Sequence, residues 1–555
     1  LWYILLVYRN IFFGLFMPVI ESKIMINSNS FKKNEADHIE LINEFRSLEK
    51  KIADNSERAK PKFEKRGQLL PRERLAALLD PDSYFIPLST LAGYKMGDDD
   101  GDKNISGGGG ISGIGYVSGV RCMVSASDSG IKGGSMTEMG VVKALRGAEI
   151  IKENKLPLIS LVESAGANLF RQSEVFLPGG RSFANLAKMS AMGIPTIAVV
   201  HGNSTAGGAY TPGLSDQVIV VKNRSKIFLA GPPLLKAALG EIATDEELGG
   251  AEMHYSVSGL AEYIADDDAE AIKKCREVVK NLGWNDGFTS TKNENFSEPI
   301  YSPNELIGVV PIDYKKPYDV KEVIARIVDG SEYLDFKPEF GKQTVTGTAR
   351  IHGYKVGIVG NNGPIFADGA VKAAQFIQLC SKHNTPLIFL QNTTGYMVGT
   401  KEERRGIIKH GSKMIQAVTN CTVPKITLRI GASFGAGEYG MAGRSFDPRF
   451  LFSWPNNKLS VMGGEQAGKT MSQVAVESAK RRGEEPNMEM IKAIEQKIID
   501  TYKAEGEALF ATARIWDDGI IDPRDTRKIL GECLNIVCDS EKRNLCPNTF
   551  GVGRM

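Results

Sequence analysis

A short glycine-rich turn occurs twice in this chain, each time directly after a run of apolar, strand-forming residues. STAGGAY, residues 204–210, is followed 229 positions later by SFGAGEY, residues 433–439. The same offset holds without a gap from position 140 to position 210 and aligns further residues. The coinciding pairs are Gly140 with Gly369, Lys143 with Lys372, Pro157 with Pro386, Leu158 with Leu387, Ile159 with Ile388, Gly166 with Gly395, Pro195 with Pro424, Gly202 with Gly431 and Ser204 with Ser433. One register of this length indicates an internal duplication, so we expect two similarly folded halves.

The pattern around each turn is that of an α/β protein. Short apolar runs such as LPLISLVES (156–164) and IPTIAVVHG (194–202) lead into glycine-containing turns and then into helical stretches. The polar stretch 284–305 contains Pro and Asn and is typical of a linker. We therefore predict three segments: an N-terminal domain over 25–285, a linker over 286–335 and a C-terminal domain over 336–555.

The first residues of the chain do not fit this pattern. LWYILLVYRNIFFGLFMPVI is apolar except for Arg9 and Asn10, whereas a Lys- and Glu-rich helical stretch follows Met25. We interpret residues 1–24 as upstream sequence translated with the gene, or as a targeting or anchor segment. In either case we expect them to lie outside the fold.

Composition excludes several function classes. Lys plus Arg number 68 against 66 for Asp plus Glu, so no overall field attracts nucleic acid, and an anionic ligand must be held by local donors. The seven cysteines include no CxxC pair, which argues against a disulfide framework or a zinc ribbon. The chain also lacks an HExxH helix, the usual zinc site of a metallohydrolase. We expect no nucleic-acid partner, no membrane partner and no metal.

The repeated turn is the candidate catalytic feature. Small residues between a strand and a helix let successive backbone N–H groups point at a ligand, where the start of the helix adds positive potential. Two such donors aimed at one oxygen form an oxyanion hole. Tight strand-to-helix packing also requires glycine, but packing alone does not explain the same turn at matched positions. Our candidates are Gly207 and Gly208 in the first half and Ala436 and Gly437 in the second.

Several long stretches of this chain resemble the carboxyltransferase (beta) subunits of biotin-dependent acyl-CoA carboxylases. The resemblance extends from about residue 35 to 535 and includes SAGANLFRQSEVF, GIPTIAVVHGNSTAGGAYTPGLSD, ASFGAGEYGMAGRSFDPRFLFSWPNNKLSVMGGEQA and ARIWDDGIIDPRDTRKILG. GAGEYGM and WPNNKLSVMGGEQA are most similar to the methylcrotonyl-CoA and geranyl-CoA carboxylase branch. The resemblance implies two tandem crotonase-like domains, the first binding an acyl-CoA and the second carboxybiotin.

This family accounts for two oxyanion cages. Release of CO₂ from carboxybiotin leaves negative charge on the ureido oxygen, and removal of a proton from the acyl-CoA leaves an enolate. By resemblance, Gly207 and Gly208 hold the thioester oxygen, and Ala436 and Gly437 hold the biotin oxygen. The freed biotin nitrogen can take the proton, so no protein base is required. The remaining implied contacts are Ala165, Gly166 and Ala206 for CoA, and Gly395, Tyr396, Phe434 and Gly435 for biotin.

The resemblance also predicts partners and location. The chain has no AMKM biotin-acceptor motif and no ATP-grasp glycine loop, so the biotin carrier and the biotin carboxylase must lie on a separate alpha subunit. The active site is expected where the first domain of one subunit faces the second domain of another. A dimer is then the minimal unit, and a hexamer is the expected assembly. We expect a cytoplasmic enzyme, or one of the mitochondrial matrix in a eukaryote.

One residue departs from the expected branch. Position 438 is Glu, where Asn is typical of the methylcrotonyl branch, and a carboxylate there opposes negative charge unless it points away or pairs with a cation such as Arg444. Acetyl-CoA or propionyl-CoA therefore remains an alternative substrate, and a biotin-dependent acyl-CoA decarboxylase subunit an alternative enzyme. A biotin-independent hydratase or isomerase, with Glu163 or Glu174 as base, and a non-catalytic scaffold are the other readings. Arg171 and Lys236 are candidate contacts for CoA phosphates, or solvated surface charges.

Overall fold

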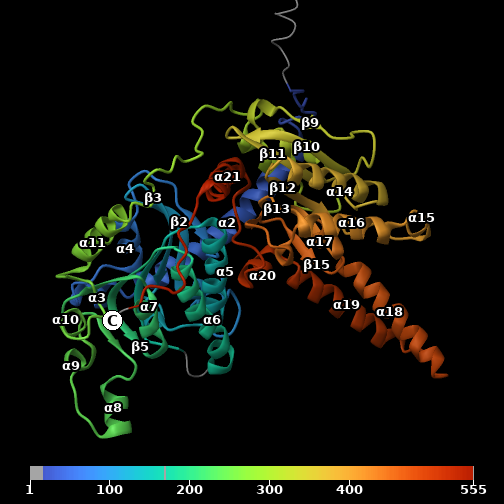
Figure 1. The fold of residues 1–555 in the computed structure, drawn as a ribbon. Coiled ribbons are helices and arrows are strands. Elements are labelled where there is room, and N and C mark those ends of the chain that lie inside the picture. Colours follow the sequence, from blue (N-terminus) through green and yellow to red (C-terminus); the bar gives the residue numbers. More distant parts are fainter. Residues whose placement is uncertain (1–16, 168–170, 554–555) are drawn as a thin grey trace, which may run out of the picture. The chain divides into compact units, whose positions relative to one another are not determined.

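The computed structural model describes residues 17–167 and 171–553, and its contacts divide them into two compact units (Figure 1). Unit 1 comprises 17–43, Lys292–Ala511 and Ile520–Asn535. Unit 2 comprises Glu44–Thr291, Thr512–Gly519 and 536–553. The helices α2 (Asn29–Glu57), α20 (Ala508–Ala513) and α21 (Thr526–Lys542) have residues in both units. The boundaries predicted from the sequence, 25–285 and 336–555, stay a prediction.

The sheet of unit 2 has the strand order β1-β2-β3-β4-β5-β6-β8, and β7 pairs with β5. From β3 onward the neighbouring strands are parallel, and β4 and β5 are almost wholly buried, as expected of apolar strands covered on both faces. The strands are β1 Ile86–Leu88, β2 Gly110–Val117, β3 Val120–Ser127, β4 Leu158–Ser164, β5 Thr196–Thr205, β6 Gln217–Val221, β7 Lys226–Phe228 and β8 Tyr263–Ala265.

The helices of unit 2 follow the strands as α/β connections. Helix α5 begins where Thr137 accepts a hydrogen bond from the Gly140 N–H, and it ends at Lys155, which has a left-handed backbone. The helices are α3 Lys60–Lys65, α4 Pro71–Leu78, α5 Glu138–Asn154, α6 Gln172–Ala191, α7 Tyr210–Leu214, α8 Pro232–Leu239, α9 Asp245–Gly249, α10 Ala251–Ser256 and α11 Asp268–Asn281.

Unit 1 repeats this plan with the order β14-β13-β12-β11-β10-β9, and β15 pairs with β13. Its strands are β9 Leu334–Asp335, β10 Thr344–Ile351, β11 Tyr354–Asn361, β12 Leu387–Thr393, β13 Lys425–Phe434, β14 Phe450–Ser453 and β15 Lys458–Ser460. Its helices are α12 Leu306–Val309, α13 Val320–Ile324, α14 Ala367–Lys382, α15 Thr400–Arg404, α16 Ile407–Asn420, α17 Ala436–Gly440, α18 Gly464–Arg481 and α19 Met488–Glu505.

The internal duplication is confirmed in backbone detail. The pairing of β4 with β5 shifts register just before Ser164 meets Ser204, and the pairing of β12 with β13 shifts just before Thr393 meets Ser433, 229 positions later. The bridges Met136–Ala167 and Ile365–Tyr396 also match at this offset. So do the positive φ values of Lys155 and Asn384, +50° and +49°. The two units therefore share one fold, the tandem crotonase-like α/β arrangement expected from the sequence.

Part of the apolar start of the chain belongs to unit 1. Val19 bridges to Glu332, and the Ile20 N–H donates to the Ser331 carbonyl at 2.9 Å. Ser22 and Lys23 donate to the carboxylate of Glu322 at 2.6 and 2.7 Å. Residues 17–24 are thus held in the fold by backbone and side-chain hydrogen bonds, whereas residues 1–16 lie outside the described residues. Among the described residues, no helix has the length and apolarity needed to cross a membrane.

Candidate active site

The first repeated turn lies in unit 2, between β5 and α7. Strand β5 ends at Thr205, a single 3-10 turn spans Ala206–Ala209, and α7 follows at once. Ala206 has a φ of +52°, which reverses the chain direction. Gly207 is exposed and Gly208 is buried, and the Ser204 hydroxyl donates to the Gly208 carbonyl at 3.0 Å. Because the first N–H groups of a helical turn have no acceptor within it, those of Gly207 and Gly208 can face a ligand.

The second turn lies in unit 1, between β13 and α17, and repeats the geometry. Gly435, which matches Ala206 in the alignment, has a φ of +55°. Ala436 is exposed and Gly437 is buried, as are their counterparts Gly207 and Gly208. The turn thus presents the start of α17 in the way that the other presents the start of α7.

A second turn adjoins each cage within its own unit. Gly166, with a φ of +92°, lies beside Ala206, and Gly395, with a φ of +108°, lies beside Gly437. Each is fixed by an equivalent bond: the Gly166 N–H donates to the Ser164 hydroxyl at 3.1 Å, and the Gly395 N–H donates to the Thr393 hydroxyl at 3.2 Å. The structure therefore brings Gly166 next to the first cage and Gly395 next to the second.

The remaining candidates differ in what their side chains can reach. Ala165 is exposed, and its N–H donates to the Gly133 carbonyl at 3.1 Å. Tyr396 packs its ring against Gly411 and Gly440, and burial raises the pKa of its phenol. Phe434 is buried, with its ring edge-on to Tyr314 at 5.2 Å between centroids. Tyr396 and Phe434 therefore support the second turn through packing.

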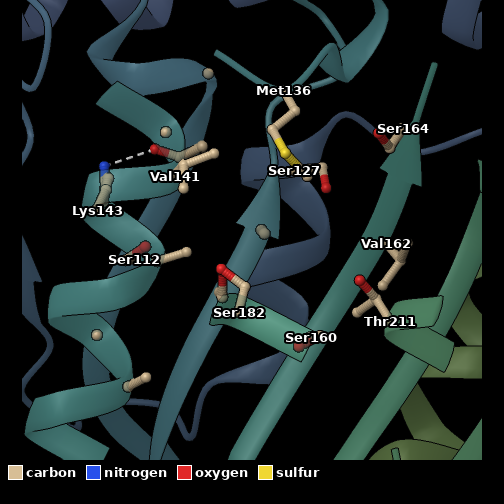
Figure 2. A pocket seen from close by; sticks show the side chains of 18 of the residues that line it. Ser112, Ser127, Met136, Val141, Lys143, Ser160, Val162, Ser164, Ser182 and Thr211 are labelled. Atoms are coloured by element: carbon tan, nitrogen blue, oxygen red, sulfur yellow. Dashed lines mark hydrogen bonds between the residues drawn. The ribbon is translucent and has the colours of Figure 1, made fainter. Parts of the chain in front are cut away.

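A cavity of about 240 Å³ opens behind the first cage, between α5, α6 and one face of the sheet (Figure 2). Gly208, Ser164 and Thr211 line it at the turn, and apolar side chains including Met189 and Ile151 line it further away. Lys143 is the only charged residue among the described residues that line it. Its ammonium donates to the carbonyls of Gly107 and Gly110 at 3.2 and 2.7 Å, and burial lowers its pKa to about 7.

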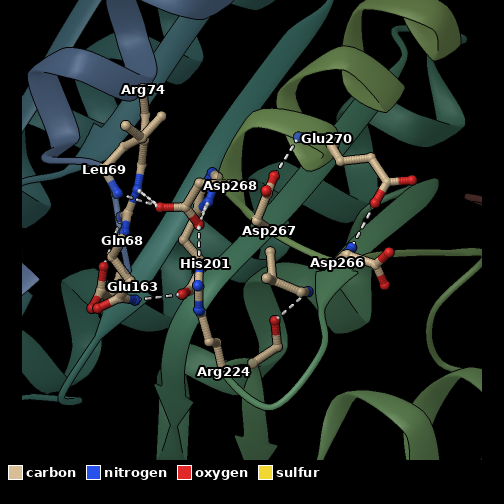
Figure 3. Close-up of polar contacts among 12 residues, drawn as sticks. Gln68, Leu69, Arg74, Glu163, His201, Arg224, Asp266, Asp267, Asp268 and Glu270 are labelled. Atoms are coloured by element: carbon tan, nitrogen blue, oxygen red, sulfur yellow. Dashed lines mark hydrogen bonds and ion pairs between the residues drawn. The ribbon is translucent and has the colours of Figure 1, made fainter. Parts of the chain in front are cut away.

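Neither carboxylate that could serve as a base lines this cavity. Glu163 precedes Ser164 on β4, so its side chain points to the opposite face of the sheet, where Arg74 donates to it at 2.7 Å (Figure 3). Glu174 is partly exposed on α6 and accepts a hydrogen bond from Ser173 at 2.8 Å. Among the described residues that line the cavity, none is therefore the carboxylate that a hydratase or isomerase requires.

The group around Glu163 is a buried structural network (Figure 3). Arg74 also donates to Asp268 at 3.0 Å, and His201 bonds Asp268 through Nδ1 at 2.9 Å. Burial opposes the charge on Asp268, but the hydrogen bond from His201 and the charge of Arg74 outweigh it and lower the pKa of Asp268 to about 2. Burial lowers the pKa of His201. The network ties α4, β4, β5 and α11 together beneath the first cage.

The partner of Glu438 differs from the expected Arg444. The Glu438 carboxylate accepts hydrogen bonds from the buried guanidinium of Arg429, in the middle of β13, and from the Ser433 hydroxyl. It lies against Gly443, away from the exposed side of the turn. In the sequence, Arg429 is a strand residue among apolar neighbours. Only the three-dimensional packing identifies it as the counterion of Glu438. The negative charge of Glu438 is thereby neutralised.

The two candidate phosphate contacts lie on the surface of unit 2. Arg171 is 3.6 Å from Asp98 and 3.7 Å from Glu174, so local carboxylates already pair with it. Lys236 is exposed near the end of α8, a helix with no buried residue. Contact of either residue with a CoA phosphate stays a prediction.

Comparison with known proteins decides the family. Residues 62–551 match the family model described as the carboxyl transferase domain. The chain belongs to the carboxyl transferase family. The crystal structure of the P. aeruginosa geranyl-CoA carboxylase beta subunit is 54% identical, with a TM-score of 0.91, and the match covers 97% of this chain and 100% of that one.

Two further relatives of this carboxyltransferase cover almost all of it. The protein named Probable biotin-dependent acyl-coenzyme A carboxylase beta2 subunit, from Mycobacterium tuberculosis, is 48% identical and covers 97% of this chain and 100% of its own length. The probable methylcrotonoyl-CoA carboxylase beta chain of Drosophila melanogaster mitochondria is 45% identical, with coverages of 97% and 95%. The expected enzyme class, the carboxyltransferase subunit of a biotin-dependent acyl-CoA carboxylase, is confirmed.

Proposed function

We propose that this carboxyltransferase acts on a branched, unsaturated acyl-CoA such as 3-methylcrotonyl-CoA or geranyl-CoA. The observation that carries the proposal is the cavity behind Gly208, which leaves room for an acyl chain to continue beyond a thioester held at the turn. The similarity to beta subunits of methylcrotonoyl-CoA and geranyl-CoA carboxylases supports the same choice.

The backbone amides of Gly207 and Gly208 hold the thioester oxygen in this proposal, while Ala165, Gly166 and Ala206 border the CoA. Removal of one oxyanion-hole donor costs an enzyme about 2.7–4 kcal/mol of transition-state stabilisation, so each of these amides contributes substantially to the reaction rate. The described residues that line the cavity include no carboxylate, and in this proposal they stabilise the enolate without removing the proton.

Ala436 and Gly437 hold the ureido oxygen of biotin, with Gly395, Tyr396, Phe434 and Gly435 around it. The residues fit this group, because Ala436 is exposed and the start of α17 presents backbone N–H groups that have no acceptor within the helix. Packing requires the two glycines, since a side chain at Gly435 would approach the Val461 carbonyl to 3.0 Å and one at Gly437 would approach the Gly395 Cα to 2.9 Å. Carboxybiotin, when bound, supplies the carboxyl group and the base for the substrate proton.

An alpha subunit must carry the biotin and its carboxylase, as in the biotin-dependent relatives. We further propose that the acyl side of one subunit faces the biotin side of another, in a hexamer built from such dimers. The enzyme is expected in the cytoplasm, or in the mitochondrial matrix in a eukaryote. Light scattering of the purified protein tests the assembly.

A transfer assay tests the substrate. The chain is purified with its biotin-carrying subunit and supplied with ATP, labelled bicarbonate and acetyl-, propionyl-, 3-methylcrotonyl- or geranyl-CoA. We expect label in the branched products and at least tenfold less in the short unbranched ones. Label confined to acetyl-CoA and propionyl-CoA would contradict the substrate assignment. Label in none, combined with decarboxylation of a carboxylated acyl-CoA, would favour the decarboxylase alternative.

A further inference from the structure

Three serines form a row across the sheet that lines the cavity behind Gly208. Ser112 on β2 pairs in register with Ser125 on β3, and Ser125 pairs in register with Ser160 on β4. Paired residues of neighbouring strands present their side chains on the same face. All three serines line the cavity, as Figure 2 shows for Ser112 and Ser160. We call Ser112, Ser125 and Ser160 the serine row.

The serine row faces the cavity with its hydroxyls available. In the part of the chain that the structure describes, none of these three side chains makes a hydrogen bond to another protein group. By contrast, the hydroxyl of Ser164, at the end of β4, accepts a hydrogen bond from the Gly166 N–H. Across the cavity, α5 contributes Ala144 and Gly147, and a Cβ added at Gly147 would meet no atom within 4 Å. These two residues of α5 have small or no side chains, so they leave space in front of the serine row.

The row lies deep relative to the cage. Ser160 precedes Ser164 by four positions on β4, which corresponds to about 13 Å along a parallel strand. An acetyl or propionyl group on a thioester held at Gly208 ends well before this point. A chain as long as geranyl extends much further toward it, and a substituent on the terminal carbon extends further still.

A hydrocarbon end placed against the row would cover three hydroxyls and offer them no partner, which costs free energy for each group desolvated. The geometry points to a different ligand: the serine row recognises an oxygen substituent, a hydroxyl or carbonyl, at the distal end of a long branched acyl chain. This inference rests on the proposed function and specifies its substrate class. Val162 lies on β4 between the cage and the row and lines the same cavity, where it packs against the hydrocarbon part of the chain.

Two substrates test the row in the complete enzyme, that is, this chain with its biotin-carrying subunit. They are geranyl-CoA and its derivative with a hydroxyl on the terminal carbon of the acyl chain. We expect Ser125→Ala to lower kcat/KM for the hydroxylated ester about tenfold, mainly through KM, and not to lower it for geranyl-CoA, whose hydrocarbon end then covers one hydroxyl fewer. Ser125→Thr keeps a hydroxyl and should restore most of the loss.

Ser256→Ala is the matched control, because that exposed serine on α10 bonds only the Glu252 carbonyl outside the cavity. It should change neither substrate. Equal effects of Ser125→Ala and Ser160→Ala on both esters, or a wild-type preference against the hydroxylated ester, would overturn the inference while leaving carboxyl transfer intact. If the wild-type enzyme carboxylates neither ester, the proposed function fails first and takes the inference with it.

Discussion

The two glycine turns share one backbone but are held in different ways. In unit 2, the Ser204 hydroxyl donates directly to the Gly208 carbonyl. In unit 1, the equivalent hydroxyl of Ser433 donates to the carboxylate of Glu438, which also accepts from Arg429. One turn is therefore fixed by a single neutral hydrogen bond, and the other by a buried ion pair. The serine hydroxyl donor is therefore at the same position in both halves. Its acceptor is a backbone carbonyl in unit 2 and a side-chain carboxylate in unit 1.

The space around the two turns differs as well. A Cβ at Gly208 would lie 3.6 Å from the Ser164 side chain, an ordinary contact at the opening of the cavity. A Cβ at Gly437 would lie 2.9 Å from the Cα of Gly395, a backbone atom that cannot move alone. The acyl-side turn borders a pocket, whereas the biotin-side turn packs against its neighbour. The difference suggests that the acyl side tolerates variation in substrate and the biotin side does not.

Gly437→Ala and Gly208→Ala test this difference most strongly. A helical Gly→Ala change without a clash stabilises by up to about 1 kcal/mol, so any loss at Gly437 reports its contact with Gly395. We expect Gly437→Ala to lower the rate of carboxyl transfer at least 100-fold, the scale of a lost oxyanion donor. Gly208→Ala should keep the fold and mainly raise KM for the acyl-CoA. Steady-state kinetics of the complete enzyme measure both.

Biotin charging by the alpha subunit serves as the control for this pair, because neither substitution lies on that subunit. Equal losses of kcat in the two variants would contradict the proposed asymmetry. Full transfer by Gly437→Ala would remove the biotin cage assignment altogether.

Glu438→Ala and Ser204→Ala compare the two supports. Removing one partner of a buried ion pair costs about 3–5 kcal/mol of folding free energy, and removing one neutral hydrogen bond costs about 1 kcal/mol. We expect Glu438→Ala to lower the free energy of unfolding of unit 1 by the larger amount and Ser204→Ala that of unit 2 by the smaller. Chemical denaturation followed by hydrogen exchange separates the units. Glu438→Gln keeps an acceptor for Ser433, so its loss of stability should lie between those of the two Ala variants. If Glu438→Ala were as stable as wild type, the ion pair would not stabilise the turn.

Sequence patterns predicted the duplication and both turns, because each depends on local signals: spacing, glycine and apolar runs. The resemblance of long stretches to a known family predicted the enzyme class. They did not predict the partner of Glu438, since Arg429 is nine positions away on a strand whose neighbours are apolar, and Arg444 is equally plausible in one dimension. The serine row was also missed. Ser112, Ser125 and Ser160 are brought together only by the register of the strands, which cannot be read from the sequence. The serine row becomes visible only when the pairing of β2, β3 and β4 is known.

The smallest expected effect concerns the aligned positions 206 and 435, which differ by one methyl group. Ala206 has a φ of +52° in the first turn, and the aligned residue in the second, Gly435, has +55°. An L-residue with a side chain loses about 1 kcal/mol or more in this region, which glycine enters freely. Ala206→Gly should therefore be neutral to slightly stabilising for unit 2, by at most about 1 kcal/mol, because glycine also gains entropy in the unfolded chain. Gly435→Ala is the reverse change, and it should destabilise unit 1 by more, because its Cβ would also approach the Val461 carbonyl to 3.0 Å. Thermal unfolding measures the stability of the two variants. If Ala206→Gly lost as much stability as Gly435→Ala, the methyl group of Ala206 would contribute packing that outweighs the strain of its backbone.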